Sequence, residues 1–455
     1  MNVLDVNIGS AKDNASSAIH NWYKFTAGFS YKLVDLIIDG MENKPTSIYE
    51  PFAGCGTTLV AAQKKRIHSI GNESQQLMCN IINAKLNWDI ERNSCLQYLN
   101  YIENYVLSKI TSDHILKECH DLLKSLYDKN TLKTLYLIRD AIKAINDEKY
   151  ELFFNLALSQ TLHKAAFHPI AVPYIVRSKK LANSGNAWEK FIAITNQMLN
   201  DLDTMPHHNR YADVYKADSR KINPHIGSDS CDLCITSPPY LNNLDYGEVS
   251  KVHTHFFGIT NNWHDITEIV RKELVTGATT HYKDCDFDLE FFRLSEFALS
   301  NPSLMRELEM RYEYLKKYSN ERHGKKSFHL LMMHYFEDMF YVLKEMRRIL
   351  KSNSKAYLIL GDSAPYGVYI PTTQFLGEIA LSIGFSEYRI DKIRSRGQKW
   401  KIKTRHNVEL SENILGLISW VRALFSSITN ILSCSRICLA GRLSAILIGI
   451  ICLLY

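Results

Sequence analysis

Residues 235–241 read Ile-Thr-Ser-Pro-Pro-Tyr-Leu and end an apolar stretch in two prolines and a tyrosine. Proline fixes φ and has no N–H to donate, so Pro238 and Pro239 end a strand and hold a carbonyl outside the sheet ladder. The Ser237 hydroxyl and this carbonyl can accept hydrogen bonds, and the Tyr240 ring can stack on a flat ligand. A buried turn with a packed tyrosine is the alternative interpretation.

A second candidate segment, Glu50-Pro-Phe-Ala-Gly-Cys-Gly-Thr-Thr58, follows a short predicted strand and opens a helix. Helix N-termini at such a position bind nucleotide-like ligands, and Gly54 and Gly56 allow a close approach of the backbone. The segment is not a P-loop, and it lacks the third glycine of the dinucleotide fingerprint. Glu73 ends the next predicted strand, where its carboxylate could accept hydrogen bonds from a ribose diol.

These candidates need a scaffold, and the hydrophobic pattern predicts one. A helix at Tyr31–Ile38, a strand at Ser47–Glu50, a helix at Thr57–Lys65 and a strand at His68–Gly71 form a βαβ unit. Residues 75–205 have helical spacing throughout, as in Thr131–Ile145 and Trp188–Leu202, and predict a helical insertion.

Strand patterns return after this insertion. They cover Ala212–Tyr215, Cys231–Ile235 and Ala356–Leu360, with a charged helical stretch at residues 287–320 and a helix at Tyr341–Leu350. The order predicts an α/β fold with a mostly parallel twisted sheet and two excursions, in which active residues lie at the carboxyl ends of strands.

Composition sets outer limits on the function. The chain has 455 residues, 46% of them hydrophobic, and a formal net charge of +6, of which three arginines of residues 421–455 supply half. The remaining charge is a weak hint of a polyanionic partner. Ten cysteines without framework spacing, and no signal-peptide pattern, favour a reducing cytoplasm. Cys231 and Cys234 have no second pair, so we interpret them as core residues and predict no metal site.

Taken together, these motifs resemble the amino-type DNA methyltransferases, which transfer a methyl group from S-adenosylmethionine to the exocyclic amine of cytosine or adenine. The resemblance covers most of residues 20–418 and implies a Rossmann-like methyltransferase fold. It implies catalytic roles for Ser237, Pro238, Pro239 and Tyr240. It also implies cofactor contacts for Phe29, Ser30, Glu50, Pro51, Phe52, Gly54, Gly56, Thr57, Thr58, Glu73 and Asp218.

The chemistry of the catalytic turn agrees with this resemblance. An aromatic amine must lose a proton and gain tetrahedral character before its nitrogen attacks a methyl sulfonium, so acceptors must face the amine. Ser237 and the Pro238 carbonyl are such acceptors, and Tyr240 offers a ring to a flipped base. Methylation at cytosine carbon 5 is excluded, because that chemistry requires a Pro-Cys dipeptide and no proline here precedes a cysteine. Within the family, serine at the first motif position is more typical of cytosine N4 than of adenine N6.

The densest basic run of the chain lies between Asp391 and His406. We expect a flexible loop that contacts DNA through Arg394, Arg396, Lys399 and Trp400, although a solvated charged loop is the alternative. The glycine loop precedes the catalytic turn in the chain, and only a short segment separates Asp218 from that turn. Both large insertions are therefore candidates for reading the DNA sequence.

We expect six segments along the chain. They are the cofactor part of the methyltransferase domain (1–75), a helical insertion (76–210), the catalytic strand and turn (211–258), a second insertion with a possible target-recognition role (259–330), the C-terminal part of the methyltransferase domain (331–420) and a hydrophobic tail (421–455). The uninterrupted apolar part of the tail is shorter than the roughly 18 to 20 residues that a membrane-spanning helix needs.

The resemblance implies double-stranded DNA as a partner, a separate restriction endonuclease, and a nucleoid-associated enzyme in a bacterial or archaeal cytoplasm. Two alternatives stay open. RNA methyltransferases have a motif of the same form, and an inactive methyltransferase-like protein could bind nucleic acid alone.

Overall fold

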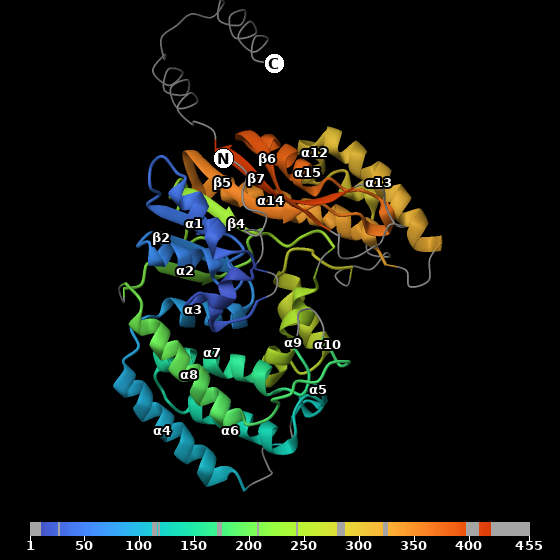
Figure 1. Ribbon diagram of the computed structural model, residues 1–455. Coiled ribbons are helices and arrows are strands. Elements are labelled where there is room, and N and C mark those ends of the chain that lie inside the picture. The colour runs from blue at the N-terminus through green and yellow to red at the C-terminus, as the bar shows by residue number, and fades with distance from the viewer. Residues whose placement is uncertain are drawn as a thin grey trace, which may run out of the picture. The chain divides into compact units, whose positions relative to one another are not determined.

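The computed structural model describes residues 11–25, 28–111, 116, 119–170, 175–206, 209–242, 244–279, 287–321, 326–396 and 409–419. The chain divides into two compact units, Met1–Ser419 and Trp420–Tyr455. The second unit, and with it the predicted hydrophobic tail, lies outside the described residues. The first unit is an α/β structure built on one sheet (Figure 1).

The described part of the chain contains a seven-stranded sheet with the order β3-β2-β1-β4-β5-β7-β6. The strands are β1 (Ser47–Glu50), β2 (His68–Glu73), β3 (Ala212–Lys216), β4 (Cys231–Thr236), β5 (Leu350–Gly361), β6 (Phe385–Arg396) and β7 (Leu410–Ser419). The first five strands in this order, from β3 through β2, β1 and β4 to β5, pair in parallel. Strand β7 runs antiparallel to both β5 and β6. The carboxyl ends of β1 to β4 therefore lie at one edge of the sheet.

Helices cover both faces of the sheet, as parallel strands require. Because side chains alternate along a strand, Ile48 packs into the cluster that α1 and α2 cover, and its neighbour Tyr49 packs into the cluster that α14 and α15 cover. These helices are α1 (Tyr31–Asp39), α2 (Thr57–Lys64), α14 (Phe328–Ile349) and α15 (Thr372–Ser382).

The predicted helical insertion is present. It comprises α3 (Gln76–Leu86), α4 (Arg92–Lys109), α5 (Asp121–Lys124), α6 (Lys129–Lys143), α7 (Glu148–Ala165) and α8 (Ala187–Asp203). The carboxylates of Asp128 and Asp147 cap α6 and α7 by accepting N–H groups of their first turns. The apolar faces of the longer helices share one core with residues of the glycine loop, such as Cys55.

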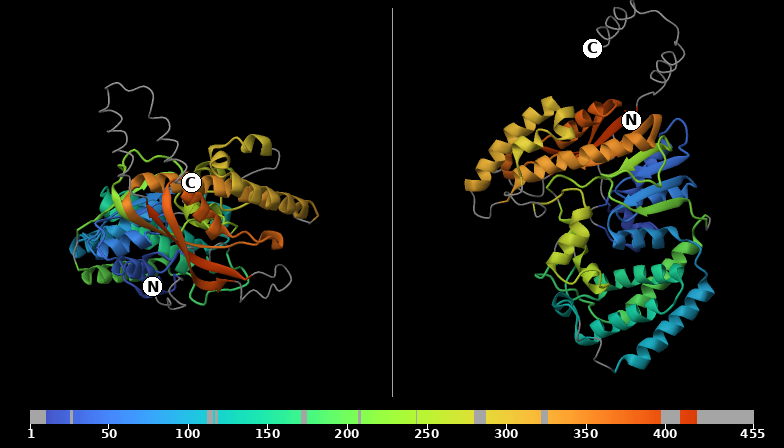
Figure 2. Two further views of the ribbon diagram at one scale, coloured as in Figure 1. Left: turned by 90° about the horizontal axis from the view of Figure 1, so that it is seen from above. Right: turned by 180° about the vertical axis from the view of Figure 1, so that it is seen from behind.

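The second excursion follows β4 and the Ser237–Tyr240 turn. It contains α9 (Tyr246–Phe256), α10 (Trp263–Asp265), a π-helical turn (Ile266–Val270), a 3₁₀ turn (Arg271–Glu273), α11 (Leu289–Phe292), α12 (Glu296–Ser300) and α13 (Pro302–Glu321). Helix α9 contacts the helical insertion, where Arg139 donates to the Phe256 carbonyl at 2.9 Å and His120 stacks on His255. The views from above and behind show α13 beside α14 (Figure 2).

Most predicted elements are found within a few residues of their expected bounds, and Cys231 and Cys234 are confirmed as buried core residues. The loop predicted from Asp391 onward is wrong in its first part, because Asp391–Arg396 completes β6 and pairs with β7. The reason is a strand-like alternation: Ile393 is buried, whereas its charged neighbour Lys392 is exposed.

Candidate active site

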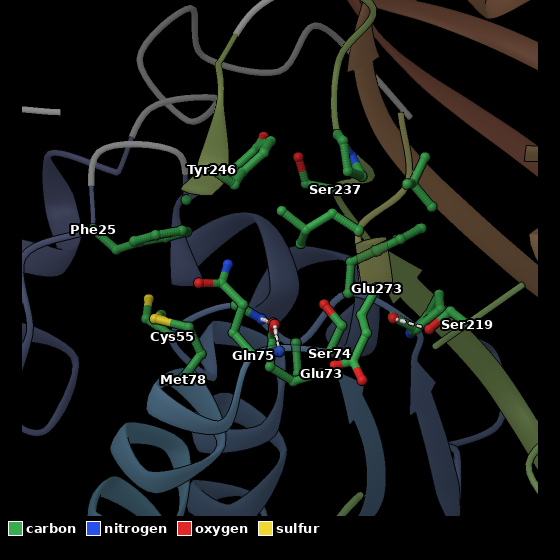
Figure 3. A pocket seen from close by; sticks show the side chains of 18 of the residues that line it. Phe25, Cys55, Glu73, Ser74, Gln75, Met78, Ser219, Ser237, Tyr246 and Glu273 are labelled. Carbon is green, nitrogen blue, oxygen red and sulfur yellow. Dashed lines mark hydrogen bonds between the residues drawn. The ribbon is translucent and has the colours of Figure 1, made fainter. Parts of the chain in front are cut away.

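A cavity lies where β1, β2, β3 and β4 end (Figure 3). Segments distant in sequence line it: Phe25, Gly28 and Phe29; Pro51 to Cys55 and Thr57; Glu73 to Gln75 and Met78; Ala217 to Ser219; Ser237 and Pro239; Tyr246; and Glu273 to Val275. The lining combines aromatic rings, a glycine loop and acidic side chains. Such a surface suits a ligand with flat, apolar and hydroxyl-bearing parts.

The two glycines of the loop have different roles. Gly54 lines the cavity in the left-handed region (φ +53°), and its N–H donates to Glu73 Oε2 at 2.9 Å. Gly56 is the N-cap of α2, also left-handed (φ +81°), and a Cβ there would approach Ile82 of α3 at 3.3 Å. Only Gly54 therefore exposes backbone to the cavity, while Gly56 allows the turn and close helix packing.

Glu50 stabilises the loop from beneath. Its carboxylate is buried and accepts hydrogen bonds from the Phe52 N–H at 3.0 Å and from the Thr58 hydroxyl at 2.8 Å. Thr58 also donates to the Ile235 carbonyl of β4, which connects the loop to the strand before the Ser237–Tyr240 turn. Burial raises the pKa of Glu50 to about 8, against the opposing effect of these hydrogen bonds.

Glu73 ends β2 and places its carboxylate at the cavity. It accepts the Gly54 N–H and the Gln75 N–H, each at 2.9 Å, so it joins the glycine loop to the start of α3. Burial raises the pKa of Glu73 to about 7, and the hydrogen bonds from these backbone groups oppose that effect. A hydroxyl donor arriving in the cavity would favour the ionised form.

A buried lysine holds the other side of the loop. Lys85 of α3 donates to the Cys55 carbonyl at 2.8 Å and lies near the His20 carbonyl. Burial lowers the pKa of Lys85. The lysine therefore connects the N-terminal segment, the glycine loop and the helical insertion at one point.

Asp218 lines the cavity and is part of an ion-pair network. Arg220 donates from Nε and Nη2 to the two oxygens of Asp218, each at 2.9 Å, and from Nη1 to Asp338 of α14 at 3.1 Å. Asp338 in turn accepts from the N–H and the hydroxyl of Thr276. The network fixes the segment that carries Glu273, Leu274 and Val275 against the cavity.

The Ser237–Tyr240 turn divides between two environments. Ser237 and Pro239 line the cavity, and Figure 3 shows the Ser237 side chain near Tyr246, across the cavity from Gln75. Pro238 is buried. Tyr240 is not part of the cavity lining; its hydroxyl donates to Glu412 of β7 at 2.9 Å, and its ring packs against the core beneath α14.

The structure thus brings together nine of the predicted site residues in one cavity: Phe29, Pro51, Phe52, Gly54, Thr57, Glu73, Asp218, Ser237 and Pro239. Ser30 lies outside it as the N-cap of α1, where its hydroxyl also donates to Asp13. Glu50, Gly56 and Thr58 support the loop rather than line the cavity.

Several lining residues have no counterpart among the predicted site residues. Gln75 and Met78 follow Glu73 on the first turn of α3, so their proximity to the predicted acid was the available signal. Tyr246 lies in the run after the Ser237–Tyr240 turn, at the start of α9. Phe25 and the Glu273–Val275 segment enter from distant parts of the chain, and no local pattern indicates their position.

The predicted DNA-contact residues are partly described. Arg394 forms an ion pair with the buried Glu412, and the Arg396 backbone ends β6. Lys399 and Trp400 lie outside the described residues. In the described residues, no group of three or more His, Cys, Asp or Glu side chains could hold a metal ion. A search of the same residues finds no helix with the length and apolar character needed to span a membrane.

The chain is similar to type II methyltransferases. M.BsoBI of Geobacillus stearothermophilus is 24% identical over 430 residues, which cover 85% of this chain and 82% of that protein. M.AvaI of Nostoc sp. is 24% identical over 411 residues, covering 85% and 83%. M.MjaII of Methanocaldococcus jannaschii is 27% identical over 135 residues, or 29% of this chain and 25% of that protein. No family model and no solved structure matches the chain.

Proposed function

We propose that this chain is an S-adenosylmethionine-dependent DNA methyltransferase that methylates the exocyclic amine of a flipped base, cytosine N4 in preference to adenine N6. It would serve as the modification component of a restriction-modification system, beside a separate endonuclease. The observation that carries this proposal is the meeting of Gly54, Glu73 and Ser237 in one cavity at the carboxyl ends of parallel strands. The similarity to type II methyltransferases along most of the chain supports it.

The residues of the cavity fit the cofactor. Gly54 offers a surface without a Cβ, Glu73 offers a carboxylate to the ribose hydroxyls, and the apolar side chains of Met78 and Val275 suit the adenine. Asp218, which forms an ion pair with Arg220, also lines the cavity. When bound, S-adenosylmethionine supplies an electrophilic methyl group. The described strand order and the site at the β1–β4 edge also support a Rossmann-like methyltransferase fold.

The catalytic turn would act on the target amine. In this proposal the Ser237 hydroxyl and the Pro238 carbonyl accept hydrogen bonds from the amine and favour the tetrahedral nitrogen that attacks. Proline at 238 and 239 prevents the turn from continuing the sheet, so these acceptors keep their direction. Tyr240 would contribute its ring at the entrance for the base.

The preference for cytosine N4 rests on Ser237, the first position of the motif. The DNA would be contacted by the basic run from Arg396 to Arg405, and the helical insertion and the 259–330 segment are candidates for reading the sequence. Helix α9 contacts the helical insertion and begins at Tyr246 on the cavity wall, so it would connect target recognition with the site.

The test is to express the full chain in a methylation-free host and sequence the genomic DNA with a method that distinguishes N4-methylcytosine from N6-methyladenine. We expect N4-methylcytosine at one recurring sequence and much less of it with the matched Ser237→Ala variant. N6-methyladenine would correct the base assignment. Methylated RNA with unmodified DNA would favour an RNA methyltransferase. Unmodified nucleic acid together with failure to bind the cofactor would favour an inactive binding protein.

A further inference from the structure

The hydroxyl of Tyr240 has a partner outside the catalytic turn. It donates to Oε1 of Glu412 at 2.9 Å, and Glu412 is only 5% exposed. Glu412 lies on β7 and pairs with Gly361 of β5 on one side and Arg394 of β6 on the other. The tyrosine at the end of the turn is therefore bonded to the antiparallel edge of the sheet.

A cation neutralises the buried carboxylate. The Arg394 Nε lies against Glu412 Oε2, and its side chain is one-third exposed. The same carboxylate therefore contacts the Arg394 guanidinium through one oxygen and the Tyr240 hydroxyl through the other. A hydrogen bond between a hydroxyl and a carboxylate is shorter and stronger than one between neutral groups.

The backbone after the turn is held separately from the ring. The Ser363 hydroxyl donates to the Leu241 carbonyl, and the Asp362 N–H donates to the Ser411 carbonyl at 3.1 Å. The path of the chain is thereby fixed by the ends of β5 and β7. The Glu412 contact, by contrast, acts on the far end of the Tyr240 side chain.

We propose that Glu412, held in place by its ion pair with Arg394, is the positioning residue that orients the Tyr240 ring for the target base. This inference rests on the proposed function. It assigns the Arg394 charge to Glu412 rather than to a DNA phosphate. It also gives the antiparallel hairpin a role in the rate of methyl transfer and none in cofactor binding.

The test is a double-mutant cycle of Glu412→Ala and Tyr240→Phe, measured as single-turnover methylation at saturating DNA and cofactor. We expect Glu412→Ala to lower the rate about tenfold or more and to leave cofactor affinity unchanged, as for the loss of a charged hydrogen bond. In the Tyr240→Phe background the same substitution should have little further effect. Glu412→Gln, which keeps an acceptor, should restore part of the rate.

Two outcomes would overturn the inference. They are an equal fall of the rate in both tyrosine backgrounds, and an unchanged rate in Glu412→Ala. The matched control is Glu409→Ala, which removes an exposed ion pair with Lys392 on the same hairpin and should leave the rate within about twofold. A thermal melt of each variant identifies loss of folding. If Glu412→Ala does not fold, Glu412→Gln replaces it in the cycle, with a smaller expected fall of the rate that should again disappear in the Tyr240→Phe background.

A second measurement separates this inference from the proposed function. Protein labelled with meta-fluorotyrosine gives a fluorine resonance for Tyr240, assigned by its loss in Tyr240→Phe. We expect Glu412→Ala to shift this resonance whether or not the wild-type protein methylates DNA. A wild-type protein that lacks methyl transfer, with the shift present, would reject the proposed function and retain the Glu412–Tyr240 contact. An unmoved resonance would reject the contact itself.

Discussion

The parallel half of the sheet and its antiparallel edge contribute to the site in different ways. In the parallel half, the Gly54–Glu73 hydrogen bond joins residues 19 positions apart. At the antiparallel edge, Tyr240 bonds to a carboxylate 172 positions further along the chain. The side of the cavity that we propose for the cofactor is therefore assembled mainly by one βαβ unit, and the side that we propose for the target base depends on contacts between distant segments. Changes in the first should remove binding, whereas changes in the second should alter rate.

The largest expected effect is that of Gly54→Val, which tests whether a change in the parallel half removes cofactor binding. A β-branched residue is strained at φ +53°, and its Cβ would lie 3.4 Å from the Phe25 ring. We expect calorimetry to detect no S-adenosylmethionine binding in the folded variant. Gly258→Val is the control, since Gly258 is also left-handed (φ +71°) but has open space around it. Wild-type affinity in folded Gly54→Val would make the loop structural only.

On the target side, Ser237→Ala should slow single-turnover methylation on the order of 100-fold, because it removes an acceptor that acts as the amine nitrogen changes geometry. Cofactor affinity should change by less than about twofold, as an interaction made in the transition state predicts. Ser230→Ala, at the opposite end of β4, removes a hydroxyl that donates to Gly227 and should have no such effect. Loss of cofactor binding in Ser237→Ala would show that the two sides of the cavity do not contribute separately to binding and to rate.

The pKa of Glu73 predicts how cofactor affinity in the parallel half depends on pH. With that pKa at about 7, Glu73 is mostly protonated below pH 7, and ribose hydroxyls need the ionised acceptor. Binding is then linked to proton release, so affinity should fall by up to about tenfold per pH unit below 7 and be level above it. Calorimetry with S-adenosylhomocysteine measures the slope. Glu73→Gln should weaken the affinity and reduce its slope against pH. Equal slopes in the wild type and the variant would exclude Glu73 as the titrating group. The other buried carboxylate, Glu50, is present in both proteins and cannot cause a difference between them.

The smallest expected effect is on the salt dependence of DNA binding. Each lost phosphate contact should lower the log–log salt slope of DNA binding by about 0.9, which is the expected result for Lys399→Ala. Arg394→Ala should leave the slope unchanged, because the Arg394 charge is engaged by Glu412. Equal slopes for Lys399→Ala and wild type would place the DNA elsewhere, and a reduced slope for Arg394→Ala would restore its phosphate contact.

The difference between contacts of sequence neighbours and contacts of distant segments also explains which features could be predicted from the sequence. Strands β1 and β4 and the glycine loop follow from local patterns, and so does the position of Glu73 at a strand end. Local patterns also predicted the buried cysteines of β4. In each case the neighbours in sequence determine the conformation.

The remaining parts depend on pairing between distant segments. Asp391–Arg396 has the charge of a loop, but pairing with β7 makes it a strand. Glu273–Val275 reaches the cavity because Arg220 and Asp338 anchor the turn beside it. The environment of Tyr240 likewise depends on β7, so its proline-containing motif predicts chemistry without predicting its partner.

The anchoring of Thr276 by Asp338 has a consequence for fragments of this protein. Every residue that lines the cavity lies between Phe25 and Val275, yet the carboxylate that holds Arg220 and Thr276 comes from α14. A polypeptide ending at residue 279 would thus contain the whole lining without its anchor or strand β5. We expect such a fragment to gain ligand affinity only when the separately expressed residues 287–419 are added, so complementation between the two pieces would report on the integrity of the cavity.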